Sequence, residues 1–202
     1  MRMADAALGL ERFRIRVNNR KILTGFYAME GLAEQSGDIM RTVDKLDKIG
    51  PDKVHALLLE QGVSDQAAGE ILDFIAITGD NAAVLSALEG YRGRNETFDQ
   101  GLEELRQVTA YLGQFGVPAE NFAVDLTIAR GLDYYTGTVY ETALLDYPQI
   151  GSVCSGGRYD NLAGYYTTVA SSCRPRSNVS FFPSYRRRKA SLSALVPGTE
   201  MN

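Results

Sequence analysis

Five amphipathic helical segments follow one another in the middle of the chain, and strand patterns lie on both sides of them. Each segment has apolar residues at helical spacing, and most begin at a capping residue or a proline. The segments begin at Asp38, Pro51, Ser64, Asp80 and about Thr97, and four of them run into Gly50, Gly62, Gly79 and Gly116. This pattern predicts a compact all-α module over residues 38–115, inserted into a second structural unit.

The flanking segments predict that unit to be a sheet. Phe13 to Asn19 alternates apolar and polar residues, which predicts a half-buried strand ending in an Asn-Asn turn, between helices at Ala4 to Leu10 and Arg20 to Gly31. After Pro118, strands are expected at 122–129, 138–145 and 152–156. Their connections are too short for crossovers, so the sheet is predicted to be antiparallel and the fold α+β.

Composition places the chain among ordinary globular proteins. It has 202 residues, of which 45% are hydrophobic and 23% charged, and no apolar run approaches the ~18 residues of a membrane span. Its N-terminus lacks the apolar segment of a signal peptide. Cys154 and Cys173 form neither a disulfide framework nor a metal-ligand pattern, so no metal site is expected. These features indicate a cytoplasmic protein with no membrane partner.

The tail from Thr167 differs from the rest of the chain. It holds six Arg and Lys residues against Glu200, a net charge of +5, which leaves −9 on the remainder of a chain whose net charge is −4. The tail is rich in Ser, Pro and Arg and lacks periodicity, so residues 167–202 are predicted to be disordered or translated out of frame. The run Arg186 to Lys189 is interpreted as accidental rather than as a nucleic-acid patch.

Two motifs near the predicted C-terminal strands carry most of the chemistry. The first is Arg130-Gly131-Leu132-Asp133-Tyr134-Tyr135-Thr136-Gly137, and the second is Ser155-Gly156-Gly157-Arg158-Tyr159-Asp160. Arg130 offers a permanent charge and a planar donor fork that suits phosphate or carboxylate oxygens. Gly156 and Gly157 leave strand backbone bare, which favours a group lying against it. The two motifs together predict a pocket for a small polar ligand beside a phosphate.

Taken singly, these features have ordinary structural explanations. A Tyr-Tyr pair such as Tyr134-Tyr135 usually packs, a Gly-Gly pair usually marks a bulge, and His55 is interpreted as a partly exposed surface residue rather than a ligand. An eight-residue string followed by a second motif is much harder to obtain by chance. The two motifs resemble the histidine-specific signature of histidyl-tRNA synthetases, which are class II aminoacyl-tRNA ligases.

The resemblance extends from about residue 4 to Tyr166. Phe13 to Leu23 is similar to the strand and helix before that family's insertion domain, and Asp44 to Gly50 is similar to the insertion domain itself. The resemblance implies that residues 1–37 and 116–166 are part of the class II catalytic core, an antiparallel sheet, and that 38–115 is the helical insertion.

The resemblance also implies a role for each site residue. Arg130 would be catalytic and would contact the ATP α-phosphate and the histidine carboxylate. Tyr134, Tyr135 and Tyr159 would line the histidine pocket. Gly156 and Gly157 would form its floor.

The implied activity is that of a histidine–tRNA ligase. Histidine carboxylate attacks the α-phosphorus of ATP, with Mg²⁺ accompanying the nucleotide, and pyrophosphate leaves. The terminal adenosine of tRNA-His then takes the histidyl group. The family's homodimer motif and Arg-x-Glu ATP motif are expected before residue 1, and a second ATP-binding arginine after Tyr166. We therefore expect a truncated ligase that is inactive by itself.

A non-catalytic relative is the main alternative. It would be a regulatory subunit of ATP phosphoribosyltransferase, or a related sensor or RNA-binding module. Such relatives tend to lose the catalytic arginine and the helical insertion. The chain has both Arg130 and residues 38–115, which favours the ligase lineage.

Overall fold

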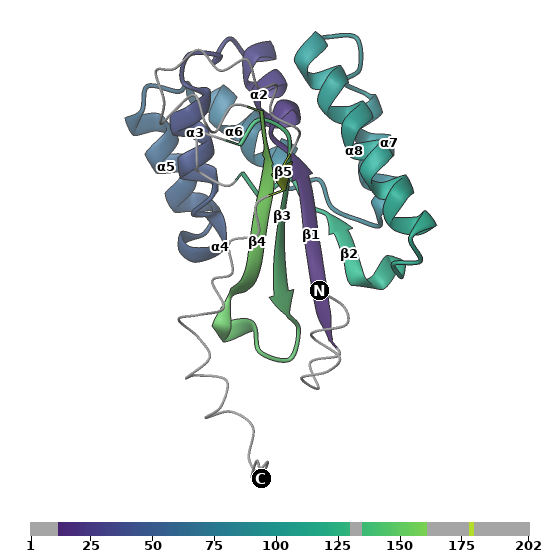
Figure 1. Ribbon diagram of the computed structural model, residues 1–202. Coiled ribbons are helices and arrows are strands. Elements are labelled where there is room, and N and C mark those ends of the chain that lie inside the picture. Colours follow the sequence, from purple (N-terminus) through teal and green to yellow (C-terminus); the bar gives the residue numbers. More distant parts are fainter. Residues whose placement is uncertain (1–11, 130–134, 161–177, 180–202) are drawn as a thin grey trace, which may run out of the picture.

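A computed structural model of the chain describes residues 12–129, 135–160 and 178–179. These residues combine a sheet with a large set of helices, which confirms the predicted α+β class. In Figure 1, helices α7 and α8 lie to the right of the strands, α3 to α6 lie to the left, and α2 lies at the upper end between them. The predicted helix over Ala4 to Leu10 falls outside the described residues.

The sheet has the strand order β2-β1-β3-β4-β5. Its strands are β1 (Phe13–Asn19), β2 (Phe122–Val124), β3 (Thr138–Leu144), β4 (Ser152–Tyr159) and β5 (Asn178–Val179). β1 pairs antiparallel with β3, β3 with β4, and β4 with β5. The expected all-antiparallel sheet is wrong at one edge, because β2 pairs parallel with β1. The helical segments between these two strands form a connection long enough for a parallel crossover.

The strand predicted over 122–129 is correspondingly shorter. Only Phe122–Val124 pairs with β1. The chain then leaves the sheet at Asp125, whose amide donates to the carbonyl of Val17. β1 therefore lies between β2 and β3, and the residues that follow Asp125 lie against Asn18 of β1 up to Ile128.

Most of the predicted helices are present. They are α2 (Arg20–Met29), α3 (Ser36–Val43), α4 (Leu46–Ile49), α5 (Pro51–Glu60), α6 (Asp65–Ile75), α7 (Asn81–Glu89) and α8 (Glu96–Gln114). Ser64 and Asp80 accept hydrogen bonds from the amides of Ala67 and Ala83, as expected of N-caps. No helix within the described ranges is long and apolar enough to cross a membrane.

The first helix of the predicted module differs from expectation. Asp38 is not its cap; the helix begins at Ser36, and Asp38 lies in its first turn, where it accepts from Arg41. The helix also stops at Val43, and the four residues of α4 form a separate turn of helix. Asp47 in α4 contacts Arg16 of β1 at 3.0 Å, so the separate turn of α4 carries a carboxylate that contacts the sheet.

Two glycines allow α2 and α8 to touch backbone to backbone. A Cβ atom at Gly25 would lie 2.5 Å from the amide nitrogen of Phe98, and one at Gly101 would lie 2.8 Å from the amide nitrogen of Ile22. Real Cβ atoms do not approach so closely, so only glycine fits at either position. This contact fixes α8 against the N-terminal half of α2, directly after β1.

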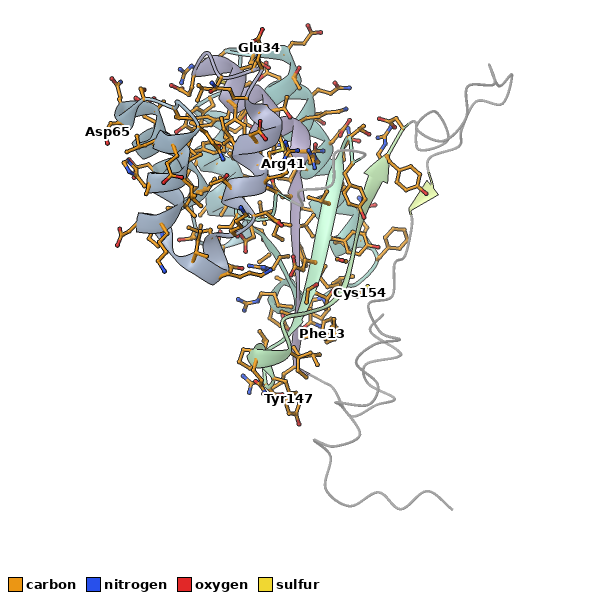
Figure 2. All side chains as sticks on the ribbon, turned by 90° about the vertical axis from the view of Figure 1, so that its left-hand side faces the viewer. Phe13, Glu34, Arg41, Asp65, Tyr147 and Cys154 are labelled. Atoms are coloured by element: carbon orange, nitrogen blue, oxygen red, sulfur yellow. The ribbon has the colours of Figure 1, made fainter. Side chains whose placement is uncertain are left out.

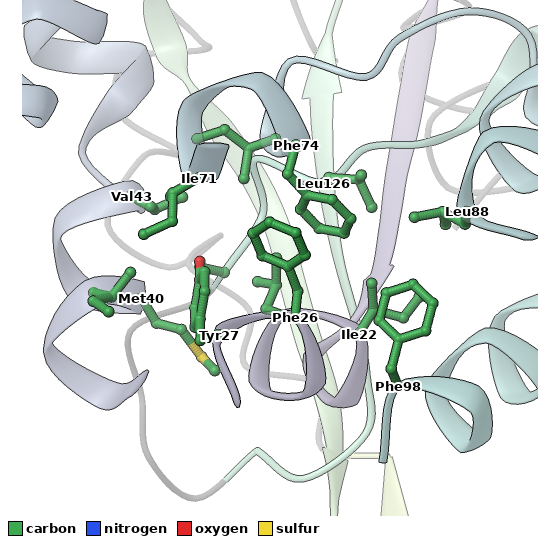
Figure 3. Close-up of a cluster of buried hydrophobic side chains, with 14 of the residues drawn as sticks. Ile22, Phe26, Tyr27, Met40, Val43, Ile71, Phe74, Leu88, Phe98 and Leu126 are labelled. Atoms are coloured by element: carbon green, nitrogen blue, oxygen red, sulfur yellow. The ribbon is translucent and has the colours of Figure 1, made fainter. Parts of the chain in front are cut away.

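One apolar core joins the helices to the sheet. Phe26 of α2 stacks on Phe74 of α6 with ring centroids 3.9 Å apart, and Figure 3 shows both rings among Ile22, Leu126 and Phe98. Residues from β1, β2 and every helix from α2 to α8 except α4 are buried in this cluster. A second cluster of Phe13, Leu144 and Ile150 lies at the other end of the sheet, where Figure 2 shows Phe13 and Tyr147.

Candidate functional site

Tyr135 lies on the bare backbone of Gly157. A Cβ atom at Gly157 would be 2.5 Å from Cδ1 of Tyr135, 2.8 Å from its Cε1 and 2.9 Å from Cγ1 of Val139. Gly157 pairs with Val139 across the β3–β4 ladder, so the ring covers this pair of residues. The tyrosine ring can lie here only because residue 157 has no side chain, and the ring covers the backbone of the two strands.

The surroundings of Tyr135 are apolar. Its side chain is buried, at 4% exposure, in a small cluster with Ile128 and Val139, and the partly buried Tyr159 packs against that cluster. Gly156, the other predicted glycine, is buried in β4 opposite Tyr140. Four of the predicted site residues therefore lie along β4 or against it. Arg130 and Tyr134 lie outside the described residues.

The segment that leads to Arg130 is held by Asn18. The Asn18 side chain is fully buried, and its Nδ2 donates to the carbonyl oxygens of Leu126 and Ile128, at 3.3 and 3.0 Å. Ile128 and Ala129 are themselves buried. Ile128 packs with Val139 and Tyr135, and Ala129 belongs to the larger core, so the two residues directly before the first motif are held in place.

Side chains on the opposite face of β4 tie the two motifs together. The Thr136 amide donates to the Arg158 carbonyl at 2.9 Å, and the Thr136 hydroxyl donates to Asp160 Oδ2 at 2.7 Å. Arg158 Nε donates to Asp160 Oδ1 at 3.1 Å. The hydrogen bond from Thr136 and the nearby charges of Arg158 and Lys21 lower the pKa of Asp160 below its usual value, although partial burial opposes the shift.

Glu104 of α8 extends this network to the helices. Its Oε2 accepts from Asn19 Nδ2 at 2.7 Å, and its Oε1 accepts from Lys21 Nζ at 2.5 Å. Arg158 Nη1 lies 3.9 Å from the same Oε1. Asn19 is also the N-cap of α2, where its side-chain oxygen accepts from the Lys21 amide. A carboxylate at this place complements the positive end of the helix dipole.

A second charged cluster lies farther along the sheet, around Arg16. Its guanidinium is 3.0 Å from Asp47, 3.2 Å from Asp125 and 3.7 Å from Glu141. Burial by itself lowers the pKa of Arg16, but the three carboxylates outweigh it, so the pKa lies above its ordinary value. A cavity of about 100 Å³ adjoins the cluster. Because one guanidinium joins carboxylates from separate parts of the chain, the arrangement is typical of a structural tie between β1, β3 and α4.

Sequence reasoning did not identify Asn18, Lys21 or Glu104 as site residues. Nothing distinguishes Glu104 from the other acidic residues of an amphipathic helix, and its partners lie 83 and 85 positions away in the sequence. One signal was available, since a glycine inside a helix, here Gly101, indicates close approach of another element. Across the described ranges no three His, Cys, Asp or Glu side chains are grouped so that they could hold a metal ion.

Comparison with known sequences links the chain to one family. The profile described as histidyl-tRNA synthetase matches residues 1–173. The histidine–tRNA ligase of Clostridium tetani is 51% identical over 160 residues, and that of Xanthomonas axonopodis pv. citri is 46% identical over 170 residues. These matches cover 79% and 80% of the chain. The chain spans 36% of the length of either ligase.

Solved structures resemble the fold as well. The histidyl-tRNA synthetase from Nostoc sp. PCC 7120 superimposes with a TM-score of 0.86 at 36% identity, over 95% of this chain and 44% of that one. A protein from Bacillus halodurans described as an ATP phosphoribosyltransferase regulatory subunit/histidyl-tRNA synthetase gives 0.62 at 23% identity, over 81% and 42% of the two chains. At that identity the second match shows a shared fold alone.

Proposed function

Because the chain belongs to the histidyl-tRNA synthetase family, we propose that it carries the histidine-binding strands of a histidine–tRNA ligase. The observation that supports this most directly is the Tyr135 ring lying on Gly157, with Tyr159 packed beside it. Two phenols over a glycine strand form a shallow apolar wall with polar tips, which suits a flat heteroaromatic side chain such as imidazole.

Each site residue has a role in this proposal. Tyr135 and Tyr159 line the imidazole pocket together with Tyr134, and Gly156 and Gly157 allow the rings and the ligand to lie close to β4. Arg130 follows the anchored segment at Ile128 and Ala129 and acts on the histidine carboxylate and the α-phosphate. A guanidinium in that place would neutralise charge that develops as the new bond forms.

The reaction has two steps. A carboxylate oxygen of histidine attacks the α-phosphorus of ATP, the bond to the β-phosphate breaks, and pyrophosphate leaves with its electron pair. A ribose hydroxyl of the terminal adenosine of tRNA-His then attacks the histidyl carbonyl, and AMP leaves. The described residues contribute to this chemistry mainly by holding histidine in position. Mg²⁺ would enter bound to ATP.

The rest of the proposal concerns the whole ligase. We assign residues 1–37 and 116–166 to its class II catalytic core and residues 38–115 to its helical insertion. A homodimeric, cytoplasmic enzyme that uses L-histidine, ATP and tRNA-His is the form in which these parts would act. The helices α3 to α8 are present in the structure, which supports the ligase over the regulatory subunit considered above.

A chimaera tests the proposal. Residues 4–166 of this chain replace the matching segment of the Clostridium tetani ligase, and histidine-dependent ATP–pyrophosphate exchange is measured. We expect exchange to be retained. A chimaera that folds and dimerises but exchanges no pyrophosphate would overturn the assignment.

Two variants of the chimaera test the roles. Arg130→His should lower the exchange rate by on the order of 10²-fold, with a much smaller change in the KM for histidine. Gly157→Ala should instead raise the KM for histidine by about 10-fold or more, because the added Cβ displaces the Tyr135 ring. Gly113→Ala, at a helical position where a Cβ meets nothing within 4 Å, is the matched control and should leave both constants unchanged.

A further inference from the structure

We propose that Glu104 is a positioning residue for the histidine pocket. From helix α8 it holds, through Arg158, the two strand segments whose opposite face presents Tyr135 and Tyr159. That the pocket takes histidine rests on the function proposed above. The contacts that join Glu104, Arg158, Asp160 and Thr136, called the clamp below, are all between described residues.

The packing of α2 on α8 brings Glu104 to its place. Gly101 touches Lys21 and Ile22 so closely that a Cβ atom would lie 2.8 Å from Lys21 Cβ. Glu104 follows three residues later, almost one helical turn, and so lies on the same side of α8. Its carboxylate is therefore held at the N-terminus of α2, with 21% of the side chain exposed.

Both oxygens of Glu104 are engaged there. Oε2 accepts from Asn19, the residue that ends β1 and caps α2, and Oε1 accepts from Lys21. Two charge-assisted hydrogen bonds fix the orientation of the carboxylate. The Arg158 guanidinium, at 3.9 Å from Oε1, completes an ion pair between α8 and β4.

Arg158 transmits this anchoring to both motifs. Its side chain passes over Gly137, where a Cβ atom would lie 3.3 Å from Arg158 Cδ, and its Nε reaches Asp160. Asp160 in turn accepts from the Thr136 hydroxyl, and the Thr136 amide donates to the Arg158 carbonyl. Residues 135–137 and 158–160 are thus fastened to each other and to α8.

The pocket residues lie on the other face of the same strand. Side chains alternate along a strand, so Gly157 and Tyr159 face away from Arg158. Tyr135 precedes Thr136 directly and rests on Gly157. A shift of the backbone at Thr136 or Arg158 therefore moves the Tyr135 ring relative to Tyr159, although Glu104 contacts Arg158 and not the pocket residues.

Hydrogen–deuterium exchange of the 202-residue chain tests the clamp without any ligand. Glu104→Ala should speed exchange at the Thr136 amide by about 10-fold, because the Thr136–Arg158 contact opens more often. Glu103→Ala is the matched control, since Glu103 is the preceding residue on α8 and its contacts are with Gln107 of α8 and with Arg92 of the turn between α7 and α8. Unchanged exchange at Thr136 in Glu104→Ala would overturn the proposal.

The chimaera described above tests the effect on histidine. Glu104→Ala should raise the KM for histidine by about 10-fold while kcat per folded molecule changes less than the KM. Glu104→Gln keeps an oxygen for Asn19 and loses the charge that faces Lys21 and Arg158. Its KM for histidine should therefore lie between those of the unsubstituted chimaera and Glu104→Ala. A lowered melting temperature with an unchanged KM in Glu104→Ala would show a purely structural role and refute the proposal.

The two proposals fail in different ways. If the unsubstituted chimaera shows no ATP–pyrophosphate exchange, the proposed function is wrong. Hydrogen–deuterium exchange at the Thr136 amide still decides whether the clamp exists. If the chimaera is active and neither Thr136 exchange nor the KM responds to Glu104→Ala, the clamp is wrong and the proposed function stands.

Discussion

A tyrosine hydroxyl lies in the middle of the apolar core, and it illustrates what a single residue contributes here. Tyr27 is fully buried, and its hydroxyl has no hydrogen-bond partner among the described residues. Figure 3 shows the hydroxyl pointing away from α2 towards Val43 and Ile71. Burial raises the pKa of Tyr27 far above its ordinary value, so the phenol stays neutral at any ordinary pH.

Removing that hydroxyl should stabilise the protein. We expect Tyr27→Phe to raise the free energy of unfolding by about 1 kcal/mol, because a buried polar group without a partner costs about 1–3 kcal/mol. Urea unfolding followed by circular dichroism measures the change. Tyr111→Phe is the control, since Tyr111 is 54% exposed and its hydroxyl is free to meet water. A loss of stability in Tyr27→Phe would mean that the hydroxyl has a partner.

The Asp160 carboxylate gives a prediction about pH. Its pKa is lowered chiefly by the Thr136 hydroxyl, so the carboxylate stabilises the folded chain above the ordinary pKa of about 4, and that contribution is lost as the pH falls through the lower, folded-state value. Thr136→Val removes the largest cause, and the pKa of Asp160 should rise towards its ordinary value. Carbon-13 NMR titration of the carboxyl group measures this shift. An unchanged midpoint in the variant would exclude the hydrogen bond as the cause.

At the scale of elements, glycines inside helices have opposite roles in α6 and α8. A Cβ atom at Gly69 of α6 would meet no neighbouring atom within 4 Å, whereas Gly101 of α8 touches the α2 backbone. Gly69→Ala should therefore stabilise the protein by about 0.5–1 kcal/mol through helix propensity. Gly101→Ala should destabilise it by about 1–3 kcal/mol, since the two helices must move apart. Thermal melts of both variants measure the pair, and equal effects would contradict the close packing of α2 on α8.

The local elements were largely predictable from the sequence, and their pairing was not. Ser64, Asp80 and Pro51 begin helices because their side chains or fixed φ angles satisfy a helix N-terminus whatever lies around it. The parallel pairing of β2 with β1 was missed because Phe122–Val124 is short. The pairing also depends on the path of the long helical connection between the two strands, which no local sequence pattern predicts. The break after Val43 was missed for a similar reason, since α4 forms a separate turn whose Asp47 contacts Arg16.

The candidate site divides in the same way. Tyr135, Gly157 and Tyr159 were predicted as site residues from two short motifs, and the structure brings them together. Asn18 and Glu104 were missed because their partners are distant in the sequence and their residue types are ordinary for a strand end and an amphipathic helix. The contact between α2 and α8, which places Glu104 beside its partners, could not be predicted from the sequence.

At the scale of the whole molecule, the helical segments and the sheet share one core. Ile22, Leu23, Phe26 and Tyr27 of α2 are each at most 2% exposed, and they pack among residues of α3, α6 and α8. Helix α2 precedes the predicted module of residues 38–115, and yet its side chains fill the centre of that module. The helices from α3 to α8 therefore share a core to which another segment of the chain contributes.

This dependence predicts which fragments fold. Residues 36–116 alone lack the four α2 side chains, whose burial contributes on the order of 6–12 kcal/mol, as much as the whole stability of a typical domain. We expect that fragment to unfold without a cooperative transition in a thermal melt followed by circular dichroism. Residues 19–116, which add the Asn19 cap and α2, should melt cooperatively, because Phe26 can again stack on Phe74 and Gly101 can again seat α8 on α2. Phe26→Ala in the longer fragment is the matched test of that contact and should abolish most of the gain. A cooperative melt of residues 36–116 near the temperature of the longer fragment would show that the helical module is independent of α2.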